Sequence, residues 1–90
     1  MEAAMFSLGT VVITPTALEA LHGDDVQKAL NRHRHGDWGE LCEHDRCQNE
    51  TALVSGGRLF SVYRDRSGTK FYIITEADRS ATTVLLPQDY

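Results

Sequence analysis

Residues 58–86, RLFSVYRDRSGTKFYIITEADRSATTVLL, are the stretch of sequence that decides the fold. Three runs in it are rich in β-branched and aromatic residues and alternate between apolar and polar positions, as strands do. These runs are residues 58–64, 70–76 and 82–86. Gly68 can take the positive φ of a hairpin turn between the first two runs, residues 77–81 connect the last two, and Pro87 stops the third. We therefore expect a three-stranded antiparallel meander.

The sequence before the meander predicts one strand and then a short helix. Residues 6–13, FSLGTVVI, contain the β-branched residues Val11, Val12 and Ile13 in succession and are typical of a strand. Thr16 followed by Glu19 matches a capping box, so a helix is expected to begin there and to end near Gly23. We expect the first strand to join an edge of the meander and to bury its valines.

Two further helices are expected before the meander begins. Asp24 can cap the first, which ends near Gly36. The second is expected over residues 38–53, because apolar residues recur there at helical spacing, and Asp37 can cap it. The order is therefore an N-terminal strand, two or three helices and the meander. This pattern predicts an α+β domain with the helices packed on one face of the sheet.

Length and composition predict one soluble domain over residues 1–90, with residues 1–5 flexible. Hydrophobic residues make up 41% of the chain and charged residues 24%, which excludes a disordered chain. No apolar run approaches the roughly 18 residues of a membrane span, so we expect no membrane partner. Nine Lys and Arg against thirteen Asp and Glu give a net charge of −4, and we expect no direct binding of nucleic acid.

The N-terminus and the cysteines predict a cytoplasmic protein. Glu2 stands where a secretory signal would carry positive charge, and no convincing cleavage site follows the short apolar stretch. The chain has two cysteines, whereas small secreted scaffolds usually carry four or more. We therefore expect reduced thiols.

Negative charge is concentrated in residues 37–50, which contain five acidic side chains and one basic one, Arg46. The plain interpretation is a solvated helix face. The alternative is an acidic surface that meets a basic partner. Trp38 is either an anchor for that partner or a core residue. The partner-binding candidates in this segment are Asp37, Trp38, Glu40, Glu43 and Asp45.

A second polar cluster, residues 75–80 (TEADRS), lies between the last two predicted strands. It adds three candidates for partner binding: Glu76, Asp78 and Arg79. The structural alternative is an ordinary turn in which Asp78 or Ser80 bonds the local backbone.

The histidines and cysteines suggest a zinc site, but their spacing along the chain does not support one. Cys42 and Cys47 are five residues apart, which on a helix places them roughly 140° from each other. They cannot share one ion there, and zinc needs four ligands. We therefore expect no metal and no cofactor.

An enzyme remains the alternative to a binding protein. A small hydrolase or nuclease would use His33 and His35 with the Glu76, Asp78 and Arg79 cluster, and Asp45 could add a carboxylate. No nucleophile elbow or phosphate-binding loop is present in the sequence. We therefore assign no catalytic residue.

Three stretches carry a resemblance to a known family. They are TVVITPTALEAL, HRHGDWGELCEHDRCQNETAL and RLFSVYRDRSGTKFYIITEADRSATTVLLPQDY, with GDWG, TEADRS and TTVLLP the most distinctive parts. Together they resemble a family of small uncharacterised "plasmid-related" proteins of proteobacterial plasmids, prophages and integrated elements. Some members are labelled as a type I restriction-modification subunit, but 90 residues cannot hold a methyltransferase domain, so that activity is not carried over.

The resemblance implies an accessory protein of a mobile genetic element. Small acidic proteins of such elements often bind a host machine, so the expected partner is a host protein or nucleoprotein complex. The leading hypothesis is a non-enzymatic protein that binds, and inhibits, a host defence or nucleic-acid-processing complex, as anti-CRISPR and anti-restriction proteins do. The alternatives are the small hydrolase or nuclease and a homo-oligomer, such as a homodimer, formed through an exposed sheet edge or face.

Overall fold

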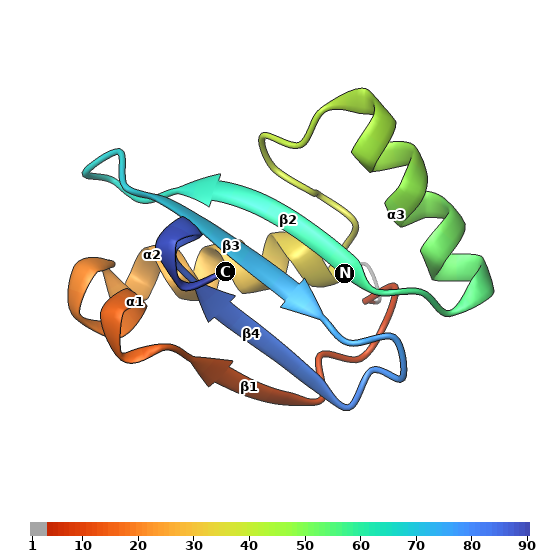
Figure 1. Cartoon of the computed structure of the whole chain (residues 1–90), viewed down its shortest axis with the longest axis horizontal. Helices are drawn as coiled ribbons and strands as arrows, with labels where there is room; N and C mark the ends of the chain where they lie inside the picture. Colours follow the sequence, from red (N-terminus) through yellow and green to blue (C-terminus); the bar gives the residue numbers. More distant parts are fainter. Residues whose placement is uncertain (1–3) are drawn as a thin grey trace.

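The computed structural model describes residues 4–90, which form an α+β fold of one four-stranded sheet and three α-helices (Figure 1). Of the segment expected to be flexible, residues 1–3 lie outside the described residues, and the backbone N–H of Met5 donates to the carbonyl of Arg34 at 2.8 Å. The elements in chain order are β1 (Thr10–Ile13), α1 (Pro15–Ala20), α2 (Gly23–Arg34), α3 (Glu43–Ser55), β2 (Leu59–Arg64), β3 (Lys70–Thr75), β4 (Ala81–Leu85) and a final 3₁₀ turn, η1 (Pro87–Asp89).

The sheet is mixed and has the strand order β1-β4-β3-β2. The meander is confirmed, because β2 pairs with β3 and β3 with β4, both antiparallel. The first strand joins an edge of the meander, as expected, but β1 lies parallel to β4, so the sheet is mixed rather than antiparallel. The expected burial of the valines is wrong: Val11 and Val12 are 47% and 46% exposed. As an edge strand, β1 has a neighbouring strand on one side only.

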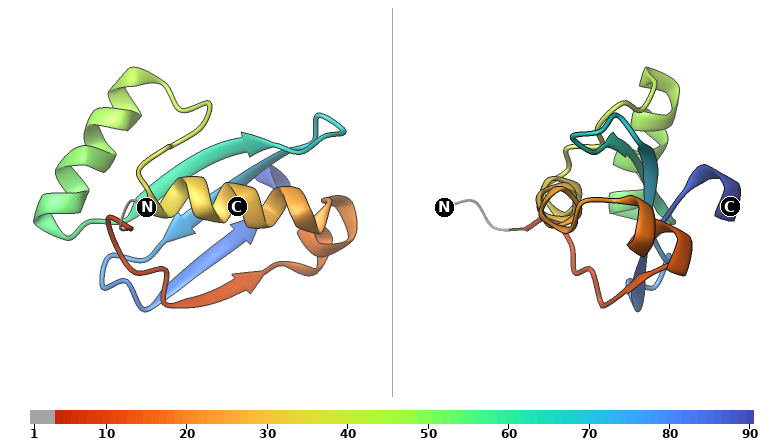
Figure 2. Two further views of the ribbon diagram at one scale, coloured as in Figure 1. Left: turned by 180° about the vertical axis from the view of Figure 1, so that it is seen from behind. Right: turned by 90° about the vertical axis from the view of Figure 1, so that its left-hand side faces the viewer.

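Helix α2 covers one face of the sheet and makes the main core with it (Figure 2). Its buried apolar residues, Val26, Ala29 and Leu30, recur at helical spacing. The strands contribute side chains from one face of the pleat, spaced two residues apart along each strand. The strand residues of this core are Tyr63, Phe71, Ile73 and Val84.

Helix α3 stands beside the outer edge of β2, away from α2 (Figure 1). The expectation that all helices pack on one face therefore holds for α2 but not for α3. A second, smaller core lies between α3, the preceding loop and β2. It consists of Trp38, Leu41, Ala52, Leu59 and Val62, with Phe6, Leu53, Phe60 and Tyr72 packed against it.

The helix predicted over residues 38–53 begins only at Glu43, so its first turn was predicted wrongly. Residues 38–40 instead run along β2, where Gly39 forms a parallel bridge with Val62. Gly39 has a φ of 72°, and a Cβ there would lie 2.0 Å from the carbonyl oxygen of Val62. Only glycine allows this approach, so pairing with the strand overrides the helical pattern.

The starts of the first two helices also differ from the prediction. Thr14, not Thr16, caps α1, because its Oγ1 accepts from the backbone N–H of Ala17 and Pro15 occupies the first turn. The Thr16 hydroxyl instead donates to Asp89 of η1 at 2.5 Å. Helix α2 begins one residue before Asp24, with His22 at its N-cap position.

Asn49 closes the outer edge of β2 with its side chain. Its Nδ2 donates to the carbonyl of Phe60 at 2.7 Å, and its Oδ1 accepts from the Phe60 N–H at 3.2 Å. Further along the same edge, the N–H of Glu40 donates to the Val62 carbonyl at 2.8 Å, and the Val62 N–H donates to the Trp38 carbonyl at 3.2 Å. A side-chain amide and a loop thus replace the missing neighbouring strand.

We predict that Asn49→Ala lowers the free energy of unfolding by about 2 kcal/mol, because both backbone groups of Phe60 lose their partner in a half-buried position. Urea denaturation measures this change. Gln48→Ala, an exposed substitution on the same helix, is the matched control and is expected to change stability by less than about 0.5 kcal/mol. Equal effects of the two substitutions would contradict the role of Asn49.

Candidate functional site

Helix α3 is exposed over most of its circumference. Of its 13 residues only Asn49 and Ala52 are buried, and Val54 is 91% exposed. An ordinary surface helix buries a wide apolar stripe, whereas α3 has almost none. The position of α3 therefore depends on a few specific contacts, and most of its side chains are exposed and can contact another molecule.

The first turn of α3 carries negative charge that no basic side chain neutralises. Glu43 and Asp45 lie in this turn, where the helix dipole favours carboxylates. Neither takes part in any of the ion pairs found within residues 4–90. Arg46, the nearest base in sequence, points its Nη2 at the carbonyl of Gly39, 3.3 Å away.

The two acids of the preceding loop are already paired. Asp37 binds Arg32 at 2.8 Å, and this hydrogen bond holds the pKa of the Asp37 carboxyl below its usual value. Glu40 binds Arg64 at 3.0 Å. All four side chains are about half exposed, so these pairs position the loop more than they stabilise the fold.

Trp38 lies in the core rather than on the surface. Its side chain is 3% exposed, stacks on Phe6 with ring centroids 6.2 Å apart, and meets the edge of His33 at 5.6 Å. Its Nε1 lies 3.4 Å from the carboxylate of Glu50. The ring therefore gives a partner no surface to contact, and it supports the loop that leads into α3.

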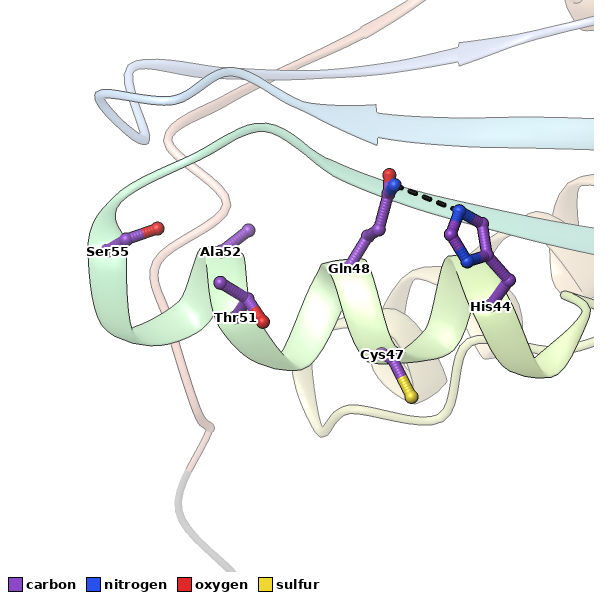
Figure 3. A pocket seen from close by; sticks show the side chains of 6 residues that line it. All are labelled: His44, Cys47, Gln48, Thr51, Ala52 and Ser55. Carbon is purple, nitrogen blue, oxygen red and sulfur yellow. Dashed lines mark hydrogen bonds between the residues drawn. The ribbon is translucent and has the colours of Figure 1, made fainter.

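A shallow hollow runs along one flank of α3, with a volume of about 380 Å³ (Figure 3). Helix α3 alone supplies its lining: His44, Cys47, Gln48, Thr51, Ala52 and Ser55. His44 and Gln48 share a hydrogen bond of 3.2 Å across one turn of the helix. An open, single-walled hollow of this kind suits contact with a protein surface better than enclosure of a small substrate.

The TEADRS segment is a tight turn between β3 and β4. Glu76 pairs with Arg58 at 3.3 Å, and Asp78 accepts from the Ser80 N–H at 3.0 Å. The hydrogen bonds from Ser80 lower the pKa of the Asp78 carboxyl. Arg79 has a φ of 62°, which is uncommon for a residue with a side chain.

Arg79 fastens this turn to the end of α3. Its Nη1 donates to the carbonyl of Gly57 at 2.6 Å, and its Nη2 donates to the carbonyl of Ala52 at 3.1 Å. Nη1 also reaches the carbonyl of Glu76 at 3.1 Å. The guanidinium thereby adds a charged donor to the Ala52 carbonyl, which also accepts from the N–H groups of Gly56 and Gly57, and it anchors the end of α3 to the sheet.

His33 sits in a buried chain of polar groups between α2 and the sheet. It is 0% exposed, with Nδ1 2.5 Å from the Ser61 hydroxyl and Nε2 2.9 Å from the Thr75 hydroxyl. Thr75 bonds Thr82 at 2.8 Å, and Thr82 donates to the Leu8 carbonyl at 2.7 Å. Burial, together with the charge of Arg79, lowers the pKa of His33 to about 4.

The residues of the enzyme alternative therefore do not form an accessible site. His33 is enclosed, with both ring nitrogens bonded, and the Nδ1 of His35 lies 2.7 Å from the carbonyl of Asn31 on its own helix. Residues 4–90 hold no group of three His, Cys, Asp or Glu side chains that could bind a metal. Cys42 and Cys47 are exposed free thiols.

Sequence reasoning missed what Asn49 and Arg79 do. Asn49 bonds the edge of strand β2 with both the nitrogen and the oxygen of its amide. The one signal in the sequence was an amide side chain four residues after Asp45, on the side of the predicted helix that carries the apolar residues. The sequence does not indicate which strand this amide would bond.

No family model, curated protein or solved structure matches the chain. Within residues 4–90, no helix has the length and apolar character needed to cross a bilayer.

We predict that Arg79→Ala lowers the free energy of unfolding by about 2 kcal/mol, because the carbonyls at the end of α3 lose a charged donor. Thermal and urea denaturation measure this loss. Arg58→Ala, which removes only an exposed ion pair nearby, is the control and is expected to cost less than about 1 kcal/mol. A loss no larger than that of the control would contradict the anchoring role of Arg79.

We also predict that acid weakens the fold through His33. The unfolded chain protonates this histidine near its ordinary pKa of 6.5, whereas the folded chain does so only near a pKa of about 4. The contribution of neutral, buried His33 to the free energy of unfolding is therefore complete above pH 6.5. This contribution, about 3 kcal/mol, is lost as the pH falls towards 4. Denaturation of wild type and His33→Gln across this range tests it. The variant should show a shallower decline, and parallel curves would contradict the assignment.

Proposed function

We propose that the chain is a non-enzymatic binding protein that presents α3 to a positively charged surface of a host protein or nucleoprotein complex. The observation that carries this proposal is the exposure of α3, which buries only two of its 13 residues. A helix that contributes so little to the core and is nonetheless held in place serves to display its side chains.

The attachment of α3 supports this function. Asn49 fixes the middle of the helix to β2, and Arg79 fixes its C-terminal end to the β3–β4 turn. Arg46 bonds the preceding loop at Gly39. A helix held in this way is already ordered before it meets a partner, so binding costs less conformational entropy.

The charge of α3 indicates the chemistry of the partner. Glu43 and Asp45 take part in none of the ion pairs found within residues 4–90, and the chain as a whole carries a net charge of −4. Such a surface attracts clusters of Lys and Arg and repels nucleic acid. A basic groove that binds nucleic acid offers such clusters, and an acidic helix lodged there would inhibit the machine.

We propose, on the resemblance to plasmid-related proteins, that this activity belongs to a mobile genetic element, and, on the N-terminus and the two cysteines, that it is cytoplasmic. An inhibitor of the anti-CRISPR or anti-restriction type would act there on a host defence complex. The hydrolase or nuclease alternative is not favoured, because the imidazole of His33 is enclosed in the core.

We predict that Glu43→Gln with Asp45→Asn weakens partner capture at least about fivefold, because it removes both acidic charges of the first turn of α3. The measurement is quantitative affinity capture from lysate of a host strain, followed by titration of the captured complex at two salt concentrations. Higher salt should weaken binding of the wild type more than that of the variant.

The matched control is Asp24→Asn, which removes an acidic side chain at an exposed position of α2. This control should bind as the wild type does. Equal binding by the α3 double variant and by this control, or binding that salt leaves unchanged, would contradict a charged α3 interface. A hydrolytic activity towards nucleic acid that follows the purified chain would contradict the non-enzymatic proposal.

A further inference from the structure

We propose that β1 is a self-association site, at which β1 of one copy pairs antiparallel with β1 of a second copy about a two-fold axis through Val12. The pairing would join two four-stranded sheets into one continuous sheet. This inference is independent of the function proposed for α3, which lies at the opposite edge of the sheet (Figure 1).

The two edges of the sheet differ in whether their outward-facing backbone groups have hydrogen-bond partners. The edge at β2 is closed by Asn49 and by the loop that pairs with Val62. The edge at β1 has no strand, helix or loop beyond it within residues 4–90 (Figures 1 and 2). Proteins usually protect an open edge with charge, proline or a bulge, and Thr10–Ile13 contains no charged residue or proline.

The hydrogen-bonding groups of this edge are self-complementary. Thr10 and Thr14 donate towards β4, to the carbonyls of Ser80 and Val84, at 3.0 Å each. By the alternation of a parallel ladder, the N–H and C=O groups of Val11 and Ile13 point away from the sheet. With the axis at Val12, Val11 of one copy lies opposite Ile13 of the other, and each such pair exchanges two hydrogen bonds.

The side chains fit the same arrangement. Val11 and Val12 are 47% and 46% exposed and lie on opposite faces of the strand. The two copies of Val12 would meet at the axis as a non-hydrogen-bonded pair, in which side chains approach most closely. On the other face, Leu8, Val11 and Leu30 line a groove of about 230 Å³ that can receive apolar side chains of the second strand.

Charge favours a second copy as the occupant. Arg34 lines this groove and belongs to none of the ion pairs within residues 4–90. The two-fold axis brings the Leu8 end of one β1 beside the α1 end of the other, because the strands run in opposite directions. Glu19 of α1 is exposed and is likewise absent from those ion pairs, so it offers Arg34 a carboxylate.

Disulfide trapping tests the register. In a background with Cys42→Ser and Cys47→Ser, Val12→Cys places two thiols opposite each other, at the Cα separation that a disulfide needs. We expect mild oxidation to convert most of this variant to a covalent dimer on a non-reducing gel. Val11→Cys is the matched control: its two copies are diagonal neighbours, beyond disulfide reach, and should cross-link at least about tenfold less.

The mass in solution tests the interaction without cysteine substitutions. Light scattering of the concentrated wild type should approach twice the chain mass of 10.1 kDa. Val12→Lys should return the monomer mass, whereas Val54→Lys, on the exposed face of α3, should leave the dimer intact. A wild type that stays monomeric, or Val11→Cys cross-linking as fast as Val12→Cys, would overturn the proposal. A monomer that binds an extended peptide along β1 would also overturn it.

Discussion

The backbone N–H and C=O groups on the outer edge of β2 need hydrogen-bond partners other than a neighbouring strand, and this requirement determines where α3 lies. Asn49 supplies both a donor and an acceptor to Phe60, so the helix that carries it must run close to that edge. One amide and one alanine, Ala52, are the only side chains of α3 that are buried. Leu53 packs against the smaller core, but most of the helix is exposed, and the proposed interaction follows from this exposure.

The sheet has one closed edge and one open edge, and the two proposed interactions lie at these opposite ends. Helix α3 stands beside β2, whereas β1 leaves Val11 and Ile13 with unused backbone groups (Figure 1). A dimer formed through β1 would carry its two α3 helices at its far ends. A partner with two matching basic surfaces would then be bound with an avidity greater than the affinity of one helix.

Local pattern was enough to predict the meander and α2, because β-branched alternation and a strong apolar stripe are properties of neighbouring residues. It failed at residues 38–40, where Gly39 pairs with a strand more than twenty residues later in the chain. The candidates Asp37, Glu40, Glu43 and Asp45 were found from charge, but the pairing of Asp37 with Arg32 and of Glu40 with Arg64 could not be predicted from local pattern. The same holds for Trp38 and Arg79, which the fold uses to hold α3.

Amide hydrogen exchange, resolved by residue, tests the contrast between the two edges most directly. The N–H groups of Phe60 and Val62 should be protected at every protein concentration, because Asn49 and Trp38 accept from them. The N–H groups of Val11 and Ile13 should exchange fast in dilute solution and become protected as the concentration rises. Fast exchange at Phe60, or protection of Val11 and Ile13 that does not depend on concentration, would contradict a closed edge at β2 and an open, self-associating edge at β1.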